Sequence, residues 1–335
     1  RSASFALRGK NMAPKDIGAA LDVEFFIEGS VRWSGAKLRL SVRLIDAATG
    51  RQLWADRYDR QMADIFDVQD EITEQIVLAV GPEVERAEVE RALQKAPERL
   101  DAWDCYYRAS WHFHRFTKAD NDIAKALYRQ SIQIDPQFAR GHAGLSYACY
   151  SDIVFSYTDD PQAALADGLR EARLAVSLDP RDAFSRHTLG RIYMLLGRHD
   201  ASIEELSRAI QLNPNLGLAY YGLGFSLAMA GRPFDALPYL ERACQIGQAE
   251  ALLWAFYTVR ALAHMLLGDD EEAVFWARRG VEAPTAEYWA PLVLTVALAH
   301  ADDADAAKDA LAQALAMRPD FTIAMFYRTF HFTEG

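Results

Sequence analysis

The hydrophobic pattern of the first third of the chain has two periods. Over residues 37–46 apolar and polar residues alternate, which places leucine and valine side chains on one face of a strand. Strand-like stretches at 25–33 and 51–58 flank it, and a glycine-containing turn separates each of them from it. This order predicts an antiparallel meander of three strands with one face in water.

Helical patterns enclose the meander. Residues 14–21 are typical of a short helix with a proline near its start. Over residues 64–94 apolar side chains recur every three to four positions, which predicts a long amphipathic helix with a bend at Gly81-Pro82. Three strands and a helix make a thin core, so we expect one or more further strands upstream of Arg1.

The remaining two thirds of the chain repeat with a period of about 34 residues. Leu189-Gly190 recurs as Leu223-Gly224, and Gly197 recurs as Gly231. This period, together with small residues and Asp/Asn-Pro boundaries, resembles the tetratricopeptide (TPR) repeat. The resemblance implies helix pairs stacked into a curved solenoid, a fold that binds partners and rarely catalyses reactions.

Proline marks the boundaries between these pairs, because it cannot continue a helix and pushes the residue before it out of the helical region. Residues 151–161 form a polar and aromatic insertion that stretches the second pair. After the sixth pair, residues 322–335 begin a further helix, and the chain either continues beyond Gly335 or folds back on that pair. The six predicted pairs cover residues 101–134, 138–179, 182–212, 216–246, 250–282 and 286–317.

The expected fold class is therefore mostly α. We assign residues 1–63 to a small, truncated N-terminal α+β domain and residues 64–99 to a long connecting helix. Residues 100–335 are assigned to a TPR α-solenoid of about six helix pairs plus the start of a capping helix.

The N-terminal part carries a second resemblance. Residues 28–32, 43–50, 53–60 and 64–72 resemble the TolB-like domain of bacterial signalling proteins and its link into TPR repeats. In that family these regions form the carboxy-terminal half of class III adenylate and guanylate cyclases, many of them rhizobial, and they also follow winged-helix DNA-binding domains. The resemblance implies that a catalytic or DNA-binding module lies upstream of Arg1. It carries over no catalytic residue, so we expect this chain not to be an enzyme by itself.

Composition narrows the range of partners. The net charge is −11: residues 1–99 hold 15 Lys/Arg against 17 Asp/Glu, and the rest of the chain holds 21 against 30. An acidic solenoid lacks the cationic footprint that binds bare nucleic acid or anionic lipid, so we expect no direct contact with nucleic acid. The longest apolar stretches, 251–267 and 288–301, are interrupted by Arg260 or too short, and we expect no membrane span.

The sequence shows no motif for a cofactor or a metal, and we expect neither. Three cysteines, Cys105, Cys149 and Cys244, fit no disulfide framework and no Cys-x-x-Cys site, which favours a reducing, cytoplasmic location. His112 and His114 point to different faces of a helix, so they cannot chelate one ion together.

The candidate binding site is the concave face of the solenoid. In TPR pairs the first helix lines this groove through positions 2, 5, 9 and 12 of the repeat, and here those positions are rich in aromatic side chains with two arginines, a composition suited to binding anchors. Alternatively, these side chains pack against residues 151–161 or the N-terminal domain and fill the groove from within. The positions selected are Trp103, Tyr106, Phe113, Arg140, Tyr147, Tyr150, Phe184, His187, Arg191, Met194, Leu218, Tyr221 and Phe225.

Two functional hypotheses follow. The first is a non-catalytic regulatory and protein-interaction region of a bacterial adenylate or guanylate cyclase, which binds a protein or peptide in the groove. The second is the sensor half of a winged-helix transcription regulator. An open sheet edge also allows a homodimer through strand addition.

Overall fold

A computed structural model describes residues 12–34, 37–61, 65–247 and 251–329, without the side chains of 65–71 and 328–329. Residues 1–11 of the expected α+β domain and residues 330–335 of the expected last helix lie outside the described residues. The chain divides into two compact units, 1–94 and 95–335. The long helix therefore groups with the sheet. The predicted fold class, a mostly helical solenoid preceded by a small antiparallel sheet, is confirmed.

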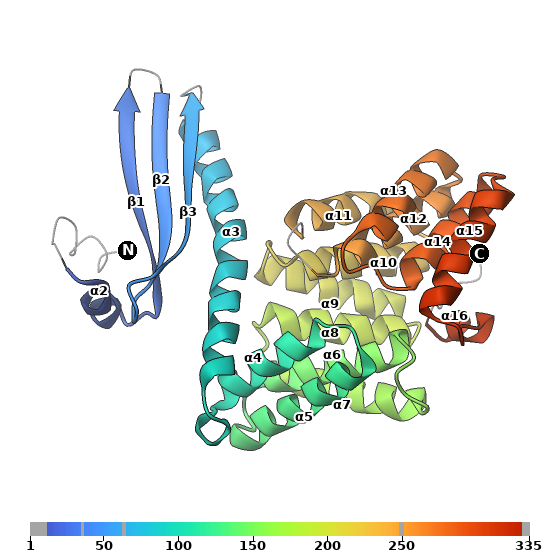
Figure 1. The fold of residues 1–335 in the computed structure, drawn as a ribbon, viewed down its shortest axis with the longest axis horizontal. Helices are drawn as coiled ribbons and strands as arrows, with labels where there is room; N and C mark the ends of the chain where they lie inside the picture. The colour runs from blue at the N-terminus through green and yellow to red at the C-terminus, as the bar shows by residue number, and fades with distance from the viewer. Residues whose placement is uncertain (1–11, 35–36, 62–64, 248–250, 330–335) are drawn as a thin grey trace. The chain divides into compact units, whose positions relative to one another are not determined.

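The first unit is a three-stranded antiparallel sheet with helices (Figure 1). The strand order is β1-β2-β3, and an irregularity between Leu44 and Ile45 shifts the pairing of β2 with β3. This is the meander that the alternating pattern predicts. The elements are α2 (Pro14–Leu21), β1 (Phe25–Ser34), β2 (Lys37–Asp46), β3 (Gln52–Gln61) and α3 (Ile65–Gln94).

The apolar face of this sheet is covered over β2 and β3 but not over β1. Val42, Tyr58 and Ile72 of α3 are buried together and form the core of the unit. The strand register places the apolar residues of β1 on the same face as Val42. About half of their surface remains in solvent, with exposed fractions of 50% for Ile27, 53% for Val31 and 56% for Trp33.

Helix α3 continues through Gly81-Pro82, where the sequence predicted a bend (Figure 1). A proline inside a helix removes one backbone donor. The helix nevertheless forms a single element of 30 residues, which ends at Gln94.

The second unit is a stack of helices in which each helix packs against the next (Figure 1). Within the described residues they form six consecutive pairs, preceded by a short 3-10 helix (Pro97–Arg99) and followed by α16 (Ile323–Thr329). The paired helices are α4 (Ala102–Phe113), α5 (Lys118–Ile134), α6 (Ala139–Val154), α7 (Pro161–Leu178), α8 (Ala183–Leu195), α9 (His199–Leu212), α10 (Gly217–Met229), α11 (Pro233–Ile246), α12 (Leu253–Leu267), α13 (Asp270–Glu282), α14 (Trp289–His300) and α15 (Ala304–Met317).

Local sequence explains where these helices begin and how closely they pack. Asp101 and Asp104 cap the start of α4 reciprocally, each side chain accepting from the other residue's backbone N–H. The side chain of Asp182 caps the start of α8 by accepting from the backbone N–H of Ser185. A Cβ atom at Gly144 of α6 would lie 2.3 Å from the Tyr128 ring of α5, so only glycine permits this approach.

The last helix pair contacts the end of α6 across the inner face of the solenoid. The indole N–H of Trp289, in α14, donates to the carbonyl of Val154 at 3.1 Å. Arg318, just after α15, donates to the carbonyl of Phe155 at 3.0 Å. Phe326 of α16 packs on the Trp289 ring at a centroid distance of 6.2 Å. The last helices therefore fold back onto the connection that follows α6, and one apolar core runs from α4 to α14.

Candidate functional site: the inner face of the solenoid

The structure separates the thirteen predicted groove residues into an interior set and a rim. Three lie at the second position of the first helices and keep contact with solvent; Trp103 is 48% exposed, and Arg140 and Phe184 are partly buried. The remaining residues are buried in the common core. These interior residues are Tyr106, Phe113, Tyr147, Tyr150, His187, Arg191, Met194, Leu218, Tyr221 and Phe225.

The chain's own insertion lies in the same apolar core as this interior set. Phe155 is buried, and its ring lies 6.1 Å from Phe116 and 6.4 Å from Trp254. The hydroxyl of Tyr157 donates to the carbonyl of Phe116 at 2.6 Å, which ties the turn after α4 to the turn after α6. Residues 155–157 therefore occupy the inner face at this level.

The rim is a continuous row along the amino-terminal ends of α4, α6 and α8. Trp103 packs edge-on against Phe138 at a centroid distance of 4.6 Å. The guanidinium of Arg140 lies 5.6 Å from the Phe184 ring and donates to Asp182 at 2.7 Å. Aromatic rings beside an oriented arginine make a surface suited to protein contacts.

Arg191 has the most unusual surroundings of the interior residues. Its side chain comes from α8 and the residue is only 1% exposed. The guanidinium donates to the Tyr150 hydroxyl and lies 4.8 Å from the Tyr150 ring, 4.7 Å from Tyr221 and 5.2 Å from Phe225. Its Nε and Nη1 atoms have no hydrogen-bond partner among the described residues, and no described carboxylate pairs with it. An arginine cannot shed its proton in a protein, so the positive charge stays in the core.

A small cavity lies beside this charge. Its volume is about 60 Å³, and its walls come from the first helices of all six pairs. Besides Arg191, the wall is largely aromatic and aliphatic, with Phe113, Tyr221, Phe225 and Trp254 among its residues.

The pKa values of two buried histidines of the solenoid are shifted in opposite directions. Nδ1 of His142 lies 2.7 Å from a carboxylate oxygen of Glu171, and this hydrogen bond raises the pKa of His142 against the effect of burial. His187 has no hydrogen-bond partner at either ring nitrogen among the described residues. Burial, reinforced by the charge of Arg191, holds the pKa of His187 well below its usual range.

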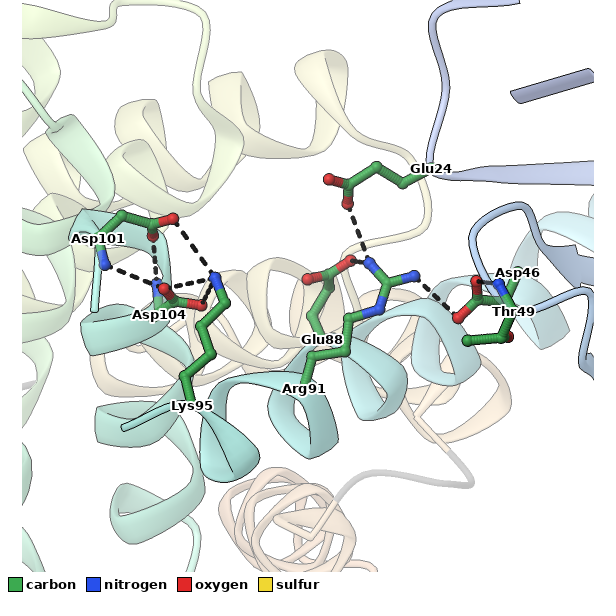
Figure 2. Close-up of polar contacts among 8 residues, drawn as sticks. All are labelled: Glu24, Asp46, Thr49, Glu88, Arg91, Lys95, Asp101 and Asp104. Carbon is green, nitrogen blue, oxygen red and sulfur yellow. Dashed lines mark hydrogen bonds and ion pairs between the residues drawn. The ribbon is translucent and has the colours of Figure 1, made fainter. Parts of the chain in front are cut away.

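Two cations in other parts of the chain, Arg91 and Lys95, are paired with carboxylates (Figure 2). In the first unit Arg91 donates to Asp46 at 2.9 Å, Glu88 at 3.0 Å and Glu24 at 3.2 Å. Burial opposes the change, but the hydrogen bond from Arg91 lowers the pKa of Asp46. In the second unit the ammonium of Lys95 lies 2.6 Å from Asp104, at the capped start of α4.

Sequence reasoning missed the later part of the inner face. The repeat positions were counted only through the fourth pair, whereas Trp254 of the fifth pair and Trp289 of the sixth also line the cavity. Trp254 is the second residue of α12, the position that Trp103 has in α4. Extending the same count by one pair would have found it. Phe155 and Trp289 could not be found this way because their contacts depend on the closure of the solenoid.

The described residues contain no group of three or more His, Cys, Asp or Glu side chains placed to hold a metal ion. None of the described helices is both long and apolar enough to span a membrane. The three cysteines, all described, are buried and free.

Comparison with known proteins supports a repeat solenoid. The family model described as "TPR repeat" matches residues 190–231. The crystal structure of the APC/C hetero-tetramer Cut9-Hcn1 superposes with a TM-score of 0.56 at 16% identity, over 74% of this chain and 46% of that one. At this identity the likeness shows the fold alone. Together these findings define the second unit as a TPR solenoid.

Two longer proteins are similar to this chain in sequence. "Putative adenylate cyclase 3" of Rhizobium meliloti (strain 1021) is 31% identical over 200 residues, which are 60% of this chain and 34% of that protein. "Superkiller protein 3" of Saccharomyces cerevisiae (strain ATCC 204508 / S288c) is 35% identical over 85 residues, 25% of this chain and 6% of that protein. The chain thus spans about a third of the length of the first relative and a small part of the second.

Proposed function

We propose that this chain is the regulatory, protein-binding region of a bacterial nucleotide cyclase, with its N-terminal part a TolB-like domain and its location cytoplasmic. The observation that carries the proposal is a TPR solenoid whose sequence is similar, over 200 residues, to a protein named as an adenylate cyclase. The block at residues 28–72 supports the TolB-like assignment, and the buried free cysteines suit a reducing compartment. No observation favours the winged-helix alternative.

The proposal is tested on the full-length parent and on this chain in parallel. Purified residues 1–335 should form no cyclic nucleotide from ATP or GTP, because the family resemblance carries over no catalytic residue to this chain. Deleting the same region from the parent should change the parent's specific cyclase activity or its response to partners. Cyclase activity in the isolated chain, or a parent whose activity and assembly ignore the deletion, would overturn the proposal.

The binding surface that we propose is the rim of Trp103, Arg140 and Phe184. These are the predicted groove residues that keep contact with solvent, and they line up across three consecutive pairs. A partner with an exposed apolar segment would match the rings, beside the ion pair of Arg140 with Asp182. Trp103→Ala and Phe184→Ala should therefore weaken partner-dependent changes in the parent's activity while the chain remains folded, as circular dichroism would report.

We also propose that two copies associate through β1. This strand pairs with β2 on one side, and its apolar row is half exposed, which is a template for strand addition. Arg32 faces Arg39 across the sheet and has no acidic partner among the described residues. An antiparallel pairing centred on Ser30 would place Glu28 of one copy opposite Arg32 of the other. The same register puts Ile27 opposite Trp33, so charge and apolar surface match together.

Charge reversal at Arg32 tests this register. Arg32→Glu would gain an attraction to Arg39 within its own sheet but would meet Glu28 of the second copy, so it should stay folded and lose the dimer. Adding Glu28→Arg should restore the dimer, whereas Lys37→Glu, a matched charge reversal on β2, should leave it intact. Light-scattering mass across a dilution series reads the result. This interface is excluded if the unmodified chain is monomeric, or if the Arg32→Glu variant forms a dimer of unchanged affinity.

A further inference from the structure

Arg191 is a deeply buried charge whose hydrogen-bond donors are only partly used within the described residues. A buried charge is normally paired, because moving an unpaired ion out of water is costly. Arg191 instead has one hydrogen bond to a hydroxyl and the faces of three aromatic rings. Burial raises the pKa of that Tyr150 hydroxyl, so it stays neutral and does not balance the charge. Two of the three guanidinium nitrogens retain unused donors among the described residues.

The cavity beside the guanidinium fixes the size and polarity of what could complete it. Its volume of about 60 Å³ leaves room for roughly four to six water-sized groups, since one water needs about 10–15 Å³. Apart from Arg191 the wall is largely apolar, with Trp254, Val259 and Leu262 contributing to it. A strongly hydrated inorganic anion would lose its water against such a wall without replacement. A carboxylate with a short hydrocarbon tail would match both the guanidinium and the apolar wall of the cavity.

We propose that the solenoid interior binds a small aliphatic monocarboxylate, of about four to six non-hydrogen atoms, with its carboxylate on Arg191 and its tail against the aromatic wall. The second hydrogen of Nη2 together with the Nε or Nη1 hydrogen forms a planar pair of donors that matches the two oxygens of a carboxylate. This inference rests on the contacts of Arg191 and does not depend on the proposed cyclase or on the rim.

Binding at this site would act on the whole solenoid. The cavity walls include Phe113 of the first pair and Trp289 of the sixth, residues far apart in the sequence. Trp289 also donates to the carbonyl of Val154, which is the contact that closes the inner face. A ligand that contacts these walls would therefore stabilise the closed arrangement relative to any arrangement in which the ends separate.

The test uses residues 1–335 and two molecules of nearly equal shape, propionate and propionamide. Each is added at 10 mM, with sodium chloride as the ionic-strength control, and both calorimetric titration and thermal unfolding are recorded. We expect propionate to bind with a dissociation constant below about 1 mM and to raise the melting temperature, because a ligand that binds only the folded state stabilises it. Propionamide should do neither.

Two variants locate the site. Arg191→Met removes the charge at similar volume and should weaken propionate binding by at least about tenfold, the usual scale for losing a charged hydrogen bond. Ala255→Val places two further carbons at the cavity wall and should weaken binding as strongly while the charge remains. Unchanged binding in both variants would overturn the proposed site.

The wild-type comparison decides the question even if neither variant folds. Equal stabilisation by propionate and propionamide would show a neutral cavity and refute carboxylate recognition. No response to either molecule at 10 mM would refute a ligand site of this class altogether.

Discussion

Arg91 in the sheet unit and Arg191 in the solenoid place the same side chain in opposite environments. Arg91 is surrounded by three carboxylates within 3.2 Å and its side chain keeps 29% of its surface exposed. Arg191 is 1% exposed, and among the described residues it contacts aromatic rings and one hydroxyl but no carboxylate. The more deeply buried cation is the one without a counter-charge, the reverse of what desolvation alone would select.

The contacts of Arg91 are those of a structural charge, whereas those of Arg191 are typical of a binding site. Arg91 ties α3 to the strand ends through Asp46 and Glu24, and these contacts balance its charge without a ligand. In the interior of the solenoid Arg191 has ring faces and one hydroxyl in place of carboxylates, and a methionine would fill a similar space without the cost of desolvating a charge. Retaining a cost of this kind is typical of binding sites.

The largest expected effect comes from the aromatic cage around Arg191. Tyr221 is buried, stacks on Phe256 at 4.8 Å and faces the guanidinium. Tyr221→Ala should lower the free energy of unfolding by about 3–5 kcal/mol, the usual range for deleting a buried aromatic ring. Trp103→Ala on the rim should cost less than about 1 kcal/mol. Urea unfolding followed by circular dichroism measures both, and equal losses would mean that rim and interior are not distinct.

Replacing each arginine by methionine tests the comparison directly. The free energy of unfolding should fall at Arg91 and should not fall at Arg191. Arg91→Met leaves the buried carboxylate of Asp46 without its cation and should cost about 1–3 kcal/mol, reduced from the value for fully buried pairs by the partial exposure of Arg91. Arg191→Met in the absence of ligand should be neutral or stabilise the solenoid by about 1 kcal/mol. A large loss at Arg191 would show that the ring faces alone balance its charge.

Sequence reasoning found the elements of the fold but not the closure of the solenoid. The meander and the six pairs follow from local periodicity and from proline boundaries, which act within a few residues. The contact of Trp289 with Val154 joins positions 135 residues apart and has no local signal. The positions of Tyr147, Arg191 and Tyr221 on the inner face could be predicted, and their burial was one of two alternatives that the pattern left open.

The smallest expected effect distinguishes the two buried histidines by pH. The pKa of His142 is raised in the folded chain by Glu171, so its contribution is present below about pH 6.5 and is lost as the pH rises through the raised value. The pKa of His187 is lowered by burial and by Arg191, so its contribution is present above about pH 6.5 and is lost on acidification. Each slope is limited to about 1.4 kcal/mol per pH unit.

Glutamine variants separate these slopes. The groups facing His142 are Glu171 and the Pro136 carbonyl, with Arg170 beside Glu171, and the charged group facing His187 is Arg191. His142→Gln should flatten the loss of stability between about pH 6.5 and 8, and His187→Gln should flatten the loss between about pH 6.5 and 5. Urea midpoints of the two variants and the unmodified chain at half-unit pH steps measure this. If both variants flatten the same side of the profile, the two histidines do not differ in the way that their contacts require.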